Sequence, residues 1–374
     1  MMKIKNIEPT PSPNTMKIII DETLPFHQRY EYSLKSHEGA NEEILKLLQI
    51  PGVLSIYRAS DFLAIDRHSK MDWRVILPTV REILGEELVS EEVHKEQTSD
   101  FGEIKVLVQF YTKIPMQVKV SDGLQEFRVS LPARFRERIF AVQKIMGNNV
   151  ISERVWVDYG VRFGVPEEVA NEVAEELDAV YTEAKINEVL IEQNISTDVL
   201  PVEVVKKDTS AEDMKSDDWK MRYRFLEKLL PKEEHLGLLE AALSDEKVSI
   251  RRLVTAYLGI IGGDEVVPLL HKALKDSSVS VRRTAGDVFS DLGLKEAQPA
   301  MIETLKDKSK LVRWRAAMFL YETGDETAIP ALQAAINDPE FEVSLQAKMA
   351  LNRITSGEEA KGSIWKQMLE GNSN

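Results

Sequence analysis

Apolar and polar side chains alternate over three short stretches in the second quarter of the chain. Residues 104–111, 116–121 and 127–131 each place an apolar side chain at every second position. A period of two puts these side chains on one face of a β-strand. Asp122 and Gly123 mark a turn between the last two stretches. The pattern therefore predicts a small antiparallel sheet with one apolar face.

Apolar residues at helical spacing follow this predicted sheet. Residues 132–146 predict one helix, and Pro166 is expected to open a longer one that reaches about Gln193. Proline is well tolerated in the first turn of a helix, because the N–H that it lacks would have had no partner there. The apolar face of the longer helix would consist of Val169, Val173, Leu177, Val180 and Ala184.

The first ninety residues combine short strands and short helices. Three prolines within residues 9–13 predict an extended chain that leads into an apolar strand at 18–20. Residues 42–49 predict a short amphipathic helix, and 53–65 predict a hairpin that turns at Ser60 and Asp61. Asp72 is expected to cap a last helix over 73–84. This part of the chain is thus predicted to be α+β.

Four residue types recur every 31 residues in the last third of the chain. They are Asp245, Asp276, Asp307 and Asp338; Arg251, Arg282 and Arg313; Gly262, Gly293 and Gly324; and Pro268, Pro299 and Pro330. A period between about 20 and 50 residues indicates a solenoid, whose units bury their apolar faces by stacking on one another. Each unit reads as two short helices, with the glycine ending the first and the proline in the first turn of the second.

This pattern resembles the HEAT-repeat class, in particular the short bacterial type related to the repeats of phycobilisome lyases. The matching features are an Asp, an Arg six residues later, an Ala near the middle of the first helix, then Gly and Pro-Leu. The resemblance covers about residues 217–354. It implies that Arg251, Arg282 and Arg313 each bond an Asp or a helix-end carbonyl of an adjacent unit.

The N-terminal part resembles another family, the N-terminal domain of the Nfu/NifU scaffold proteins of iron–sulfur cluster assembly. The match covers about residues 3–88 and lies in the segments 7–17, 50–53, 60–65 and 72–78. In that family the cluster sits on a separate domain with a Cys-x-x-Cys motif, and this chain has no cysteine. The polar and aromatic members of the motif are Asn14, Thr15, Lys17, Asp61 and Trp73. Local turn chemistry and burial of the tryptophan are an alternative explanation for these residue types.

Composition narrows the possible functions. The net charge of −14 argues against a nonspecific nucleic-acid binder, which needs a basic surface. The lack of cysteine excludes disulfides, thiolate zinc sites and cysteine-bound clusters on this chain. The sequence contains no nucleophile elbow, His-Glu-x-x-His, P-loop or dinucleotide fingerprint. We therefore expect no catalytic residue, metal or cofactor, and from the hydropathy neither a membrane span nor a secretion signal.

The order of the parts resembles the conserved virulence factor C family of low-GC Gram-positive bacteria. The resemblance spans nearly the whole chain and implies a cytoplasmic protein linked to virulence-factor expression by an undefined route. The expected architecture is multidomain, an α+β Nfu-like domain and a small α+β middle domain before an α–α HEAT-like solenoid. The expected boundaries are 1–89 for the Nfu-like domain, 90–195 for the middle domain, 196–218 for a linker, 219–356 for the repeats and 357–374 for a tail.

Two groups of repeat residues are candidates for binding a partner. Arg252, Arg283 and Arg315 stand apart from the arginine ladder and would form a basic ridge for an acidic partner, a solvated face being the alternative. By family resemblance the second helix of each unit should line the binding groove. Its candidate contact residues are His271, Lys272, Glu303, Lys306 and Gln333.

Three functional hypotheses follow from these features. The first is a non-enzymatic scaffold or adaptor, with one protein partner on the repeats and a second at the Nfu-like domain. Another is an accessory factor in iron–sulfur cluster assembly or delivery that does not itself ligate the cluster through cysteine. The last is an enzyme with its site in the middle domain, which predicts a pocket with convergent ionisable groups. No nucleic-acid or membrane partner is expected.

Overall fold

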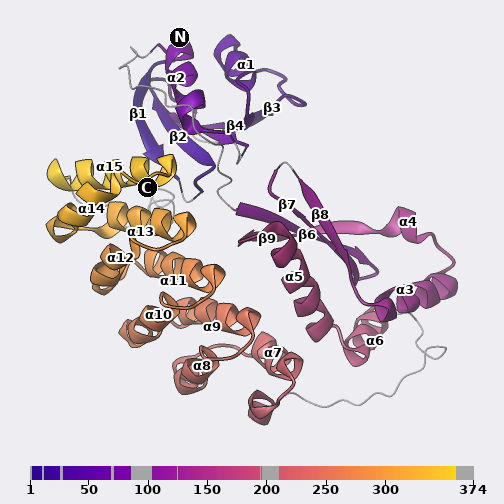
Figure 1. Cartoon of the computed structure of the whole chain (residues 1–374). Coiled ribbons are helices and arrows are strands. Elements are labelled where there is room, and N and C mark those ends of the chain that lie inside the picture. The colour runs from indigo at the N-terminus through magenta and orange to yellow at the C-terminus, as the bar shows by residue number, and fades with distance from the viewer. Residues whose placement is uncertain are drawn as a thin grey trace. The chain divides into compact units, whose positions relative to one another are not determined.

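The computed structural model describes residues 2–10, 12–25, 28–68, 71–85, 103–123, 125–193, 195 and 210–358. The chain divides into two compact units, which are considered separately (Figure 1). The central unit runs from Gly102 to Leu292, and the terminal unit combines Met1–Phe101 with Gly293–Asn374. Most of the proposed linker (196–209) and the tail from 359 onward lie outside the described residues.

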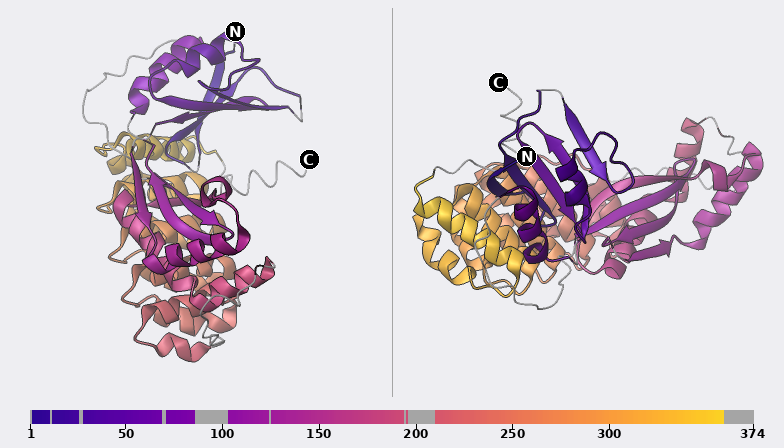
Figure 2. Two further views of the ribbon diagram at one scale, coloured as in Figure 1. Left: turned by 90° about the vertical axis from the view of Figure 1, so that its right-hand side faces the viewer. Right: turned by 90° about the horizontal axis from the view of Figure 1, so that it is seen from above.

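The N-terminal part of the terminal unit is an antiparallel sheet of order β1-β2-β5-β4-β3. Its elements are β1 (Ile4–Pro9), β2 (Thr15–Ile20), β3 (Arg29–Ser33), α1 (Glu42–Leu48), β4 (Val53–Ala59), β5 (Phe62–Arg67) and α2 (Trp73–Ile83). Both helices cover one face of the sheet (Figure 2), where Ile18, Ile56 and Ile65 are fully buried. The predicted helices and hairpin are confirmed, and Asp72 caps α2 by accepting a hydrogen bond from Arg74 N at 2.8 Å.

The middle part of the chain lies in the central unit and holds a four-stranded antiparallel sheet of order β8-β7-β6-β9. Its elements are β6 (Glu103–Tyr111), β7 (Ile114–Ser121), β8 (Glu126–Ser130), α3 (Ala133–Met146), α4 (Val150–Glu153), β9 (Val155–Phe163), α5 (Pro166–Val180) and α6 (Glu183–Glu192). Residues of β6, β7, α3, α5 and α6 form its apolar core.

Two sequence predictions for this part need correction. The single helix expected from Pro166 to about Gln193 was wrong, because the chain ends α5 at Val180 and starts again at α6. Thr182 caps α6 by accepting a hydrogen bond from Lys185 N at 3.2 Å, so a new helix start is favoured at this point. Strand β9 was not predicted, since its apolar side chains, such as Val155 and Val161, are exposed at the sheet edge rather than buried on one face.

The repeats form paired helices in both units. In the central unit they are α7 (Trp219–Lys228), α8 (Leu236–Ala242), α9 (Val248–Ile261), α10 (Val267–Ala273) and α11 (Val279–Leu292). In the terminal unit they are α12 (Gln298–Thr304), α13 (Lys310–Thr323), α14 (Ile329–Ala335) and α15 (Phe341–Thr355). Each recurring proline lies in the first turn of a second helix, as predicted. Gly262 and Gly293 adopt positive φ after α9 and α11, whereas Gly324 is extended, with φ −65°.

The recurring arginines bind the recurring aspartates of the next repeat. Arg251 donates from Nε and Nη2 to the carboxylate of Asp276 at 2.7 and 3.0 Å. Arg313 binds Asp338 at the same two distances. Arg222 does so with Asp245, although it lies outside the 31-residue phase and was not predicted. The predicted ladder is confirmed for these pairs, and such two-bond contacts fix both spacing and orientation.

Arginines of the ladder also donate hydrogen bonds to backbone carbonyls. Nη1 of Arg251 donates to Asp245 O at 2.8 Å, and Nη1 of Arg282 donates to Asp276 O at 2.9 Å. The aspartate in turn caps the next helix, since Asp276 accepts a hydrogen bond from Ser278 N at 2.7 Å. Burial opposes ionisation of Asp276, but the hydrogen bonds from Arg251 and Ser278 outweigh it and lower its pKa below 3.8.

We predict that Arg251→Ala lowers the free energy of unfolding of the central unit by about 2 kcal/mol, because charge-assisted hydrogen bonds to Asp276 and to a helix-end carbonyl are lost. Urea unfolding followed by circular dichroism measures the change. Lys275→Ala, which removes an exposed lysine next to the joint, is the control and should leave the midpoint unchanged. Equal midpoints for Arg251→Ala and wild type would contradict a stabilising role for the ladder.

The same joint predicts a pH dependence. Because the folded pKa of Asp276 lies below its ordinary 3.8, the carboxylate contributes stability above that value, and the contribution is lost as the pH falls through the folded pKa. Acidification from about pH 5 to about pH 3 should therefore destabilise the wild-type chain more than Arg251→Ala, which has already lost the pairing. Urea midpoints at the two pH values test this, and an equal loss in both chains would refute it.

Candidate functional site

The candidate residues of the second helices lie on the surface of both units. Lys272 on α10 belongs to the central unit, and its Nζ donates to Ser244 Oγ at 2.9 Å. His271 beside it is half-buried, with its ring centroid 5.4 Å from that of Phe289. The candidates in the terminal unit are all exposed, and they are Glu303, Lys306 and Gln333. These side chains present mixed polar chemistry rather than a charged patch of one sign.

The three arginines of the proposed basic ridge are largely covered. Arg252 on α9 donates from Nη2 to Glu176 Oε1 of α5 at 3.1 Å. Arg283 on α11 is only 2% exposed, pairs with Asp287 at 3.0 Å and lies 4.1 Å from the ring centroid of Phe163 in β9. Arg315 on α13 is 5% exposed. In the central unit, therefore, the middle domain itself occupies the side of the repeats that carries Arg252 and Arg283.

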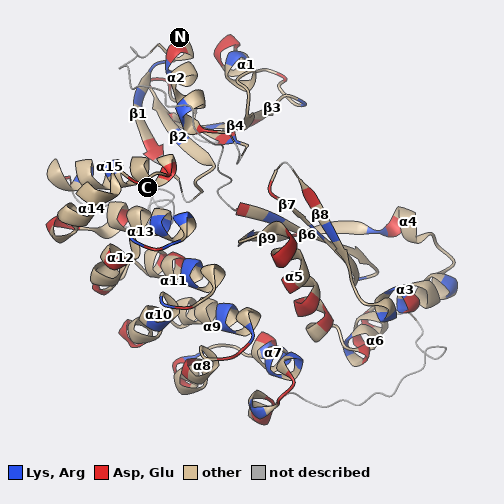
Figure 3. Ribbon diagram, in the orientation of Figure 1, with Lys and Arg blue, Asp and Glu red and all other residues tan. Residues whose placement is uncertain are grey.

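Glu176 is the centre of this contact. Figure 3 shows mainly acidic residues along α5 and basic residues on α9. The Glu176 carboxylate also accepts a hydrogen bond from Arg162 Nη2 at 3.1 Å. Burial raises the pKa of Glu176, and the charge of Arg162 opposes it only partly. This buried carboxylate, bound by Arg162 of β9 and Arg252 of α9, ties α5 to the first helix α9.

The Nfu-type motif residues fall into two groups. Trp73 is fully buried and donates from Nε1 to Pro13 O at 2.9 Å. Asn14 and Thr15 lie at the same place, where Asn14 Oδ1 accepts from Arg67 at 3.5 Å and Thr15 donates to Asp66.

The other two motif residues, Lys17 and Asp61, lie farther along the β2–β5 pair. Lys17 forms an ion pair with Glu8 at 2.9 Å. The Asp61 carbonyl accepts a hydrogen bond from Ile20 N at 2.8 Å. The structure therefore brings Asn14, Thr15 and Trp73 together, whereas Lys17 and Asp61 make separate local contacts.

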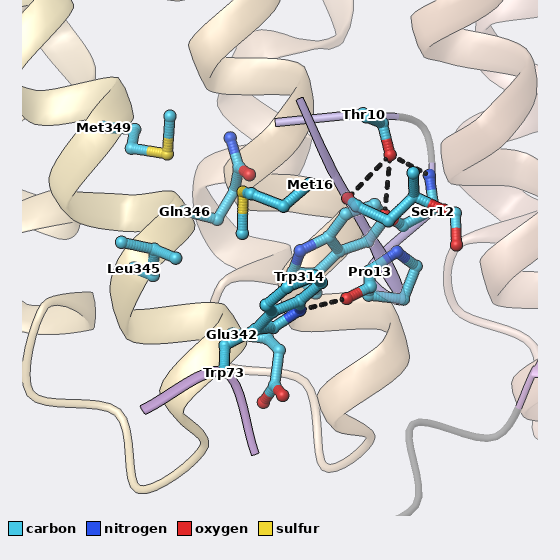
Figure 4. A pocket seen from close by; sticks show the side chains of 11 residues that line it. Thr10, Ser12, Pro13, Met16, Trp73, Trp314, Glu342, Leu345, Gln346 and Met349 are labelled. Carbon is cyan, nitrogen blue, oxygen red and sulfur yellow. Dashed lines mark hydrogen bonds between the residues drawn. The ribbon is translucent and has the colours of Figure 1, made fainter. Parts of the chain in front are cut away.

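Two residues that the sequence did not indicate complete the first group. Arg67 of β5 donates from Nη2 to Glu342 Oε1 of α15 at 2.5 Å, and their side chains are 1% and 8% exposed. The guanidinium also lies 5.1 Å from the ring centroid of Trp73. Sequence carried no signal for this pair because its members are 275 positions apart. A small cavity of about 20 Å³ lies beside it, between the motif segment and α15 (Figure 4).

Two observations on the described part of the chain concern catalysis. It contains no cluster of three or more His, Asp or Glu side chains able to hold a metal ion. A surface depression in the middle domain is lined by Phe140, Gln143, Lys144, Gly147 and Asn148, of which only the lysine is ionisable. Burial is the main cause of the raised pKa values of Tyr159, at about 12, and of Glu176.

Comparison with known proteins identifies all three parts. The model described as scaffold protein Nfu/NifU N terminal matches residues 4–91, and the model described as virulence factor matches 109–190. HEAT repeats match at 211–286 and 267–352. The expected fold class is thereby confirmed. Among the described residues, no helix is both long and apolar enough to cross a bilayer.

Curated relatives match over almost the entire length. Conserved virulence factor C of Staphylococcus haemolyticus is 46% identical over 99% of this chain and 100% of its own length. The chain belongs to the conserved virulence factor C family. The Staphylococcus aureus protein of that name is 48% identical over 98% of this chain and 99% of its own. The uncharacterized Bacillus subtilis protein YpgR is 54% identical over 99% and 98% of the two chains.

In this family member we predict a strong energetic coupling between Glu176 and Arg252. Glu176→Gln and Arg252→Gln should each destabilise the central unit, while the double variant should lose less than the sum, with a coupling energy of about 1–3 kcal/mol. Urea unfolding of the four chains gives this cycle. Glu167→Ala, an exposed glutamate on the same helix, combined with Arg252→Gln is the control and should be additive. Additivity of the Glu176 pair would show that the buried contact contributes no specific coupling.

Proposed function

We propose that this protein is a non-enzymatic adaptor, with one protein partner on the HEAT repeats and a second at the Nfu-like domain. The proposal rests on the difference between the two helices of each repeat, because the first helices contact other parts of the chain and the second helices are exposed. In the central unit the first helices α7 and α9 are packed against α5 of the middle domain. In the terminal unit α15 contacts the Nfu-like domain. The second helices keep exposed polar side chains, and these are the surfaces available to another protein.

The exposed residues fit a reversible contact with a protein. Lys272, Glu303, Lys306 and Gln333 combine both signs of charge with an amide, as is typical of the polar rim of a transient interface. We propose that such an interaction in the cytoplasm links the protein to virulence-factor expression, as the family name suggests. Neither the array nor the Nfu-like domain needs to catalyse a reaction for this role.

An accessory role in iron–sulfur cluster assembly or delivery is the second candidate. The match to the Nfu/NifU N-terminal model over residues 4–91 favours it. Since the chain has no cysteine, the cluster would remain on a partner protein, and the Nfu-like domain would contact that carrier or its target. This role predicts that cluster-assembly proteins co-purify with the chain and depend on residues 1–89.

We predict that charge reversal on the second helices removes the partner of the repeats. The tagged full-length chain is used for capture from native cytoplasm and compared with the double variant Lys272→Glu and Lys306→Glu. The amount of the repeat partner, measured by quantitative mass spectrometry, should fall at least about tenfold, because two favourable interface charges become repulsive. The control variant carries Lys35→Glu and Lys215→Glu, which change the net charge equally at other exposed positions.

The outcomes separate the two candidate functions. A partner lost with the second-helix variant and kept by the control supports the adaptor. Cluster-assembly proteins that are retained by both variants and lost with a chain lacking residues 1–89 favour the iron–sulfur role. If the captured proteins do not differ between the second-helix variant and the control, the proposed binding face on the second helices is wrong.

A further inference from the structure

Helix α15 presents two separate stripes of side chains. Val343, Ala347, Ala350 and Ile354 are buried on one stripe, and α13 and α14 pack against the helix. The neighbouring stripe has a different composition and contacts the Nfu-like domain. It consists of Phe341, Glu342, Leu345 and Gln346, at positions i, i+1, i+4 and i+5 of the helix. Residues with this spacing lie on one side of an α-helix, so α15 reads as a helix bound by two surfaces.

The Nfu-like domain supplies a matching contact for three of the four residues of the second stripe. Arg67 binds Glu342, and the guanidinium of Arg74 lies 5.5 Å from the ring centroid of Phe341. Phe341 and Leu345 pack against the apolar core of the domain. Glu342, Leu345 and Gln346 line the same small cavity as Trp73, Pro13 and Thr10 (Figure 4). Aromatic, acidic and aliphatic side chains are thus each met by a distinct group.

The energetics of this contact favour selectivity over strength. Removing a carboxylate and a guanidinium from water costs about as much as their attraction returns, so a buried ion pair selects the right partner more than it strengthens binding. The packing beside it is also incomplete. The cavity has room for about one water molecule, and Gln346 Nε2, which is buried at its wall, makes no hydrogen bond within the described residues. A permanent core contact would be expected to fill this space and pair this amide.

We propose that the face of the Nfu-like domain formed by Arg67, Trp73 and Arg74 is a helix-recognition site, occupied in cis by α15. The ligand class is an amphipathic helix with an aromatic residue, an acidic residue directly after it, and Leu-Gln one turn later. A partner protein with such a helix displaces α15 and binds in its place. This deepens the proposed adaptor function by naming the chemistry of the partner at the Nfu-like domain, and it rests on that function only for the existence of such a partner.

Occupation in cis makes a quantitative demand on any competing helix. A segment tethered in the same chain acts at an effective concentration of about millimolar. If α15 occupies the face in about 99% of molecules, a free helix binds about 100-fold more weakly than it would to an empty face. A substitution that weakens only the cis contact must therefore strengthen binding in trans, which a purely structural contact does not predict.

The test uses a fluorescent peptide of residues 338–356 and the purified full-length chain, with binding followed by anisotropy. Phe341→Ala in the chain weakens the cis contact without leaving a buried charge unpaired, and it should tighten peptide binding about tenfold or more relative to wild type. Lys348→Ala removes an exposed side chain of the same helix and is the matched control, expected to bind as wild type does. Circular dichroism and urea unfolding establish that each variant is folded.

Two further substitutions identify the surface that the peptide uses. Adding Arg67→Ala to the Phe341→Ala chain should weaken binding about tenfold or more, and a peptide carrying Glu342→Ala should lose a similar factor. Combining the two changes should cost little beyond either one, because they remove the same ion pair. If Arg67→Ala does not fold, Arg74→Ala replaces it, tested against a peptide carrying Phe341→Ala, with an expected loss of about threefold.

Two results would overturn the proposal. In the first, the peptide does not bind Phe341→Ala even at millimolar concentration, so that α15 is a fixed cap of the array. In the second, the peptide affinity is unchanged by Arg67→Ala and by Glu342→Ala, which would mean that the peptide attaches to the repeats through its other stripe. Neither result depends on capturing a partner from cells, so the failure of this proposal and that of the adaptor function are distinguishable.

Discussion

In three of the repeats, one aspartate holds two neighbouring repeats together. Asp276 caps the start of its own helix and binds the guanidinium of Arg251 from the preceding repeat, and Asp245 and Asp338 do the same with Arg222 and Arg313. Because a single carboxylate performs both tasks, the position of the helix start and the spacing between repeats cannot vary independently. The strict phase of aspartate and arginine in the sequence is the consequence. The first helices oriented in this way are the ones that the middle domain contacts in the central unit.

The repeats were predictable from the sequence because their chemistry is local and periodic. Asp276 and Arg251 are 25 positions apart, and the same pairing recurs two periods later between Arg313 and Asp338. Strand β9 was missed for the opposite reason, since its exposed valines do not follow the burial pattern from which strands are recognised. The break between α5 and α6 depends on the Thr182 cap, whose signal is weak beside a continuous apolar stripe. Hydrophobic periodicity therefore fails to predict helix breaks that depend on a local cap and strands whose apolar side chains are exposed at a sheet edge.

The candidate sites depend on contacts that no local pattern encodes. Arg252 was recognisable as a basic residue outside the ladder. The sequence did not indicate that its partner is Glu176 of the same chain. Likewise, Trp73 and Asn14 were visible as members of a family motif, whereas Arg67 and Glu342 carried no signal. Both contacts use an acidic residue on a helix to meet an arginine elsewhere in the same unit. The net charge of −14 does not predict these two ion pairs, because each pair combines one negative and one positive side chain.

The discontinuous make-up of the terminal unit has a consequence for synthesis on the ribosome. Arg67 and its partner Glu342 are separated by 275 positions, so the Nfu-like domain emerges long before α15 exists. At roughly 5–20 residues per second, about 14–55 s pass between the translation of the two residues. During this interval the nascent chain contains Arg67 but not yet the helix α15 that carries Glu342. Under the helix-recognition proposal, a newly made molecule meets helices of other proteins before it meets its own, and the order of translation sets which of them arrives first.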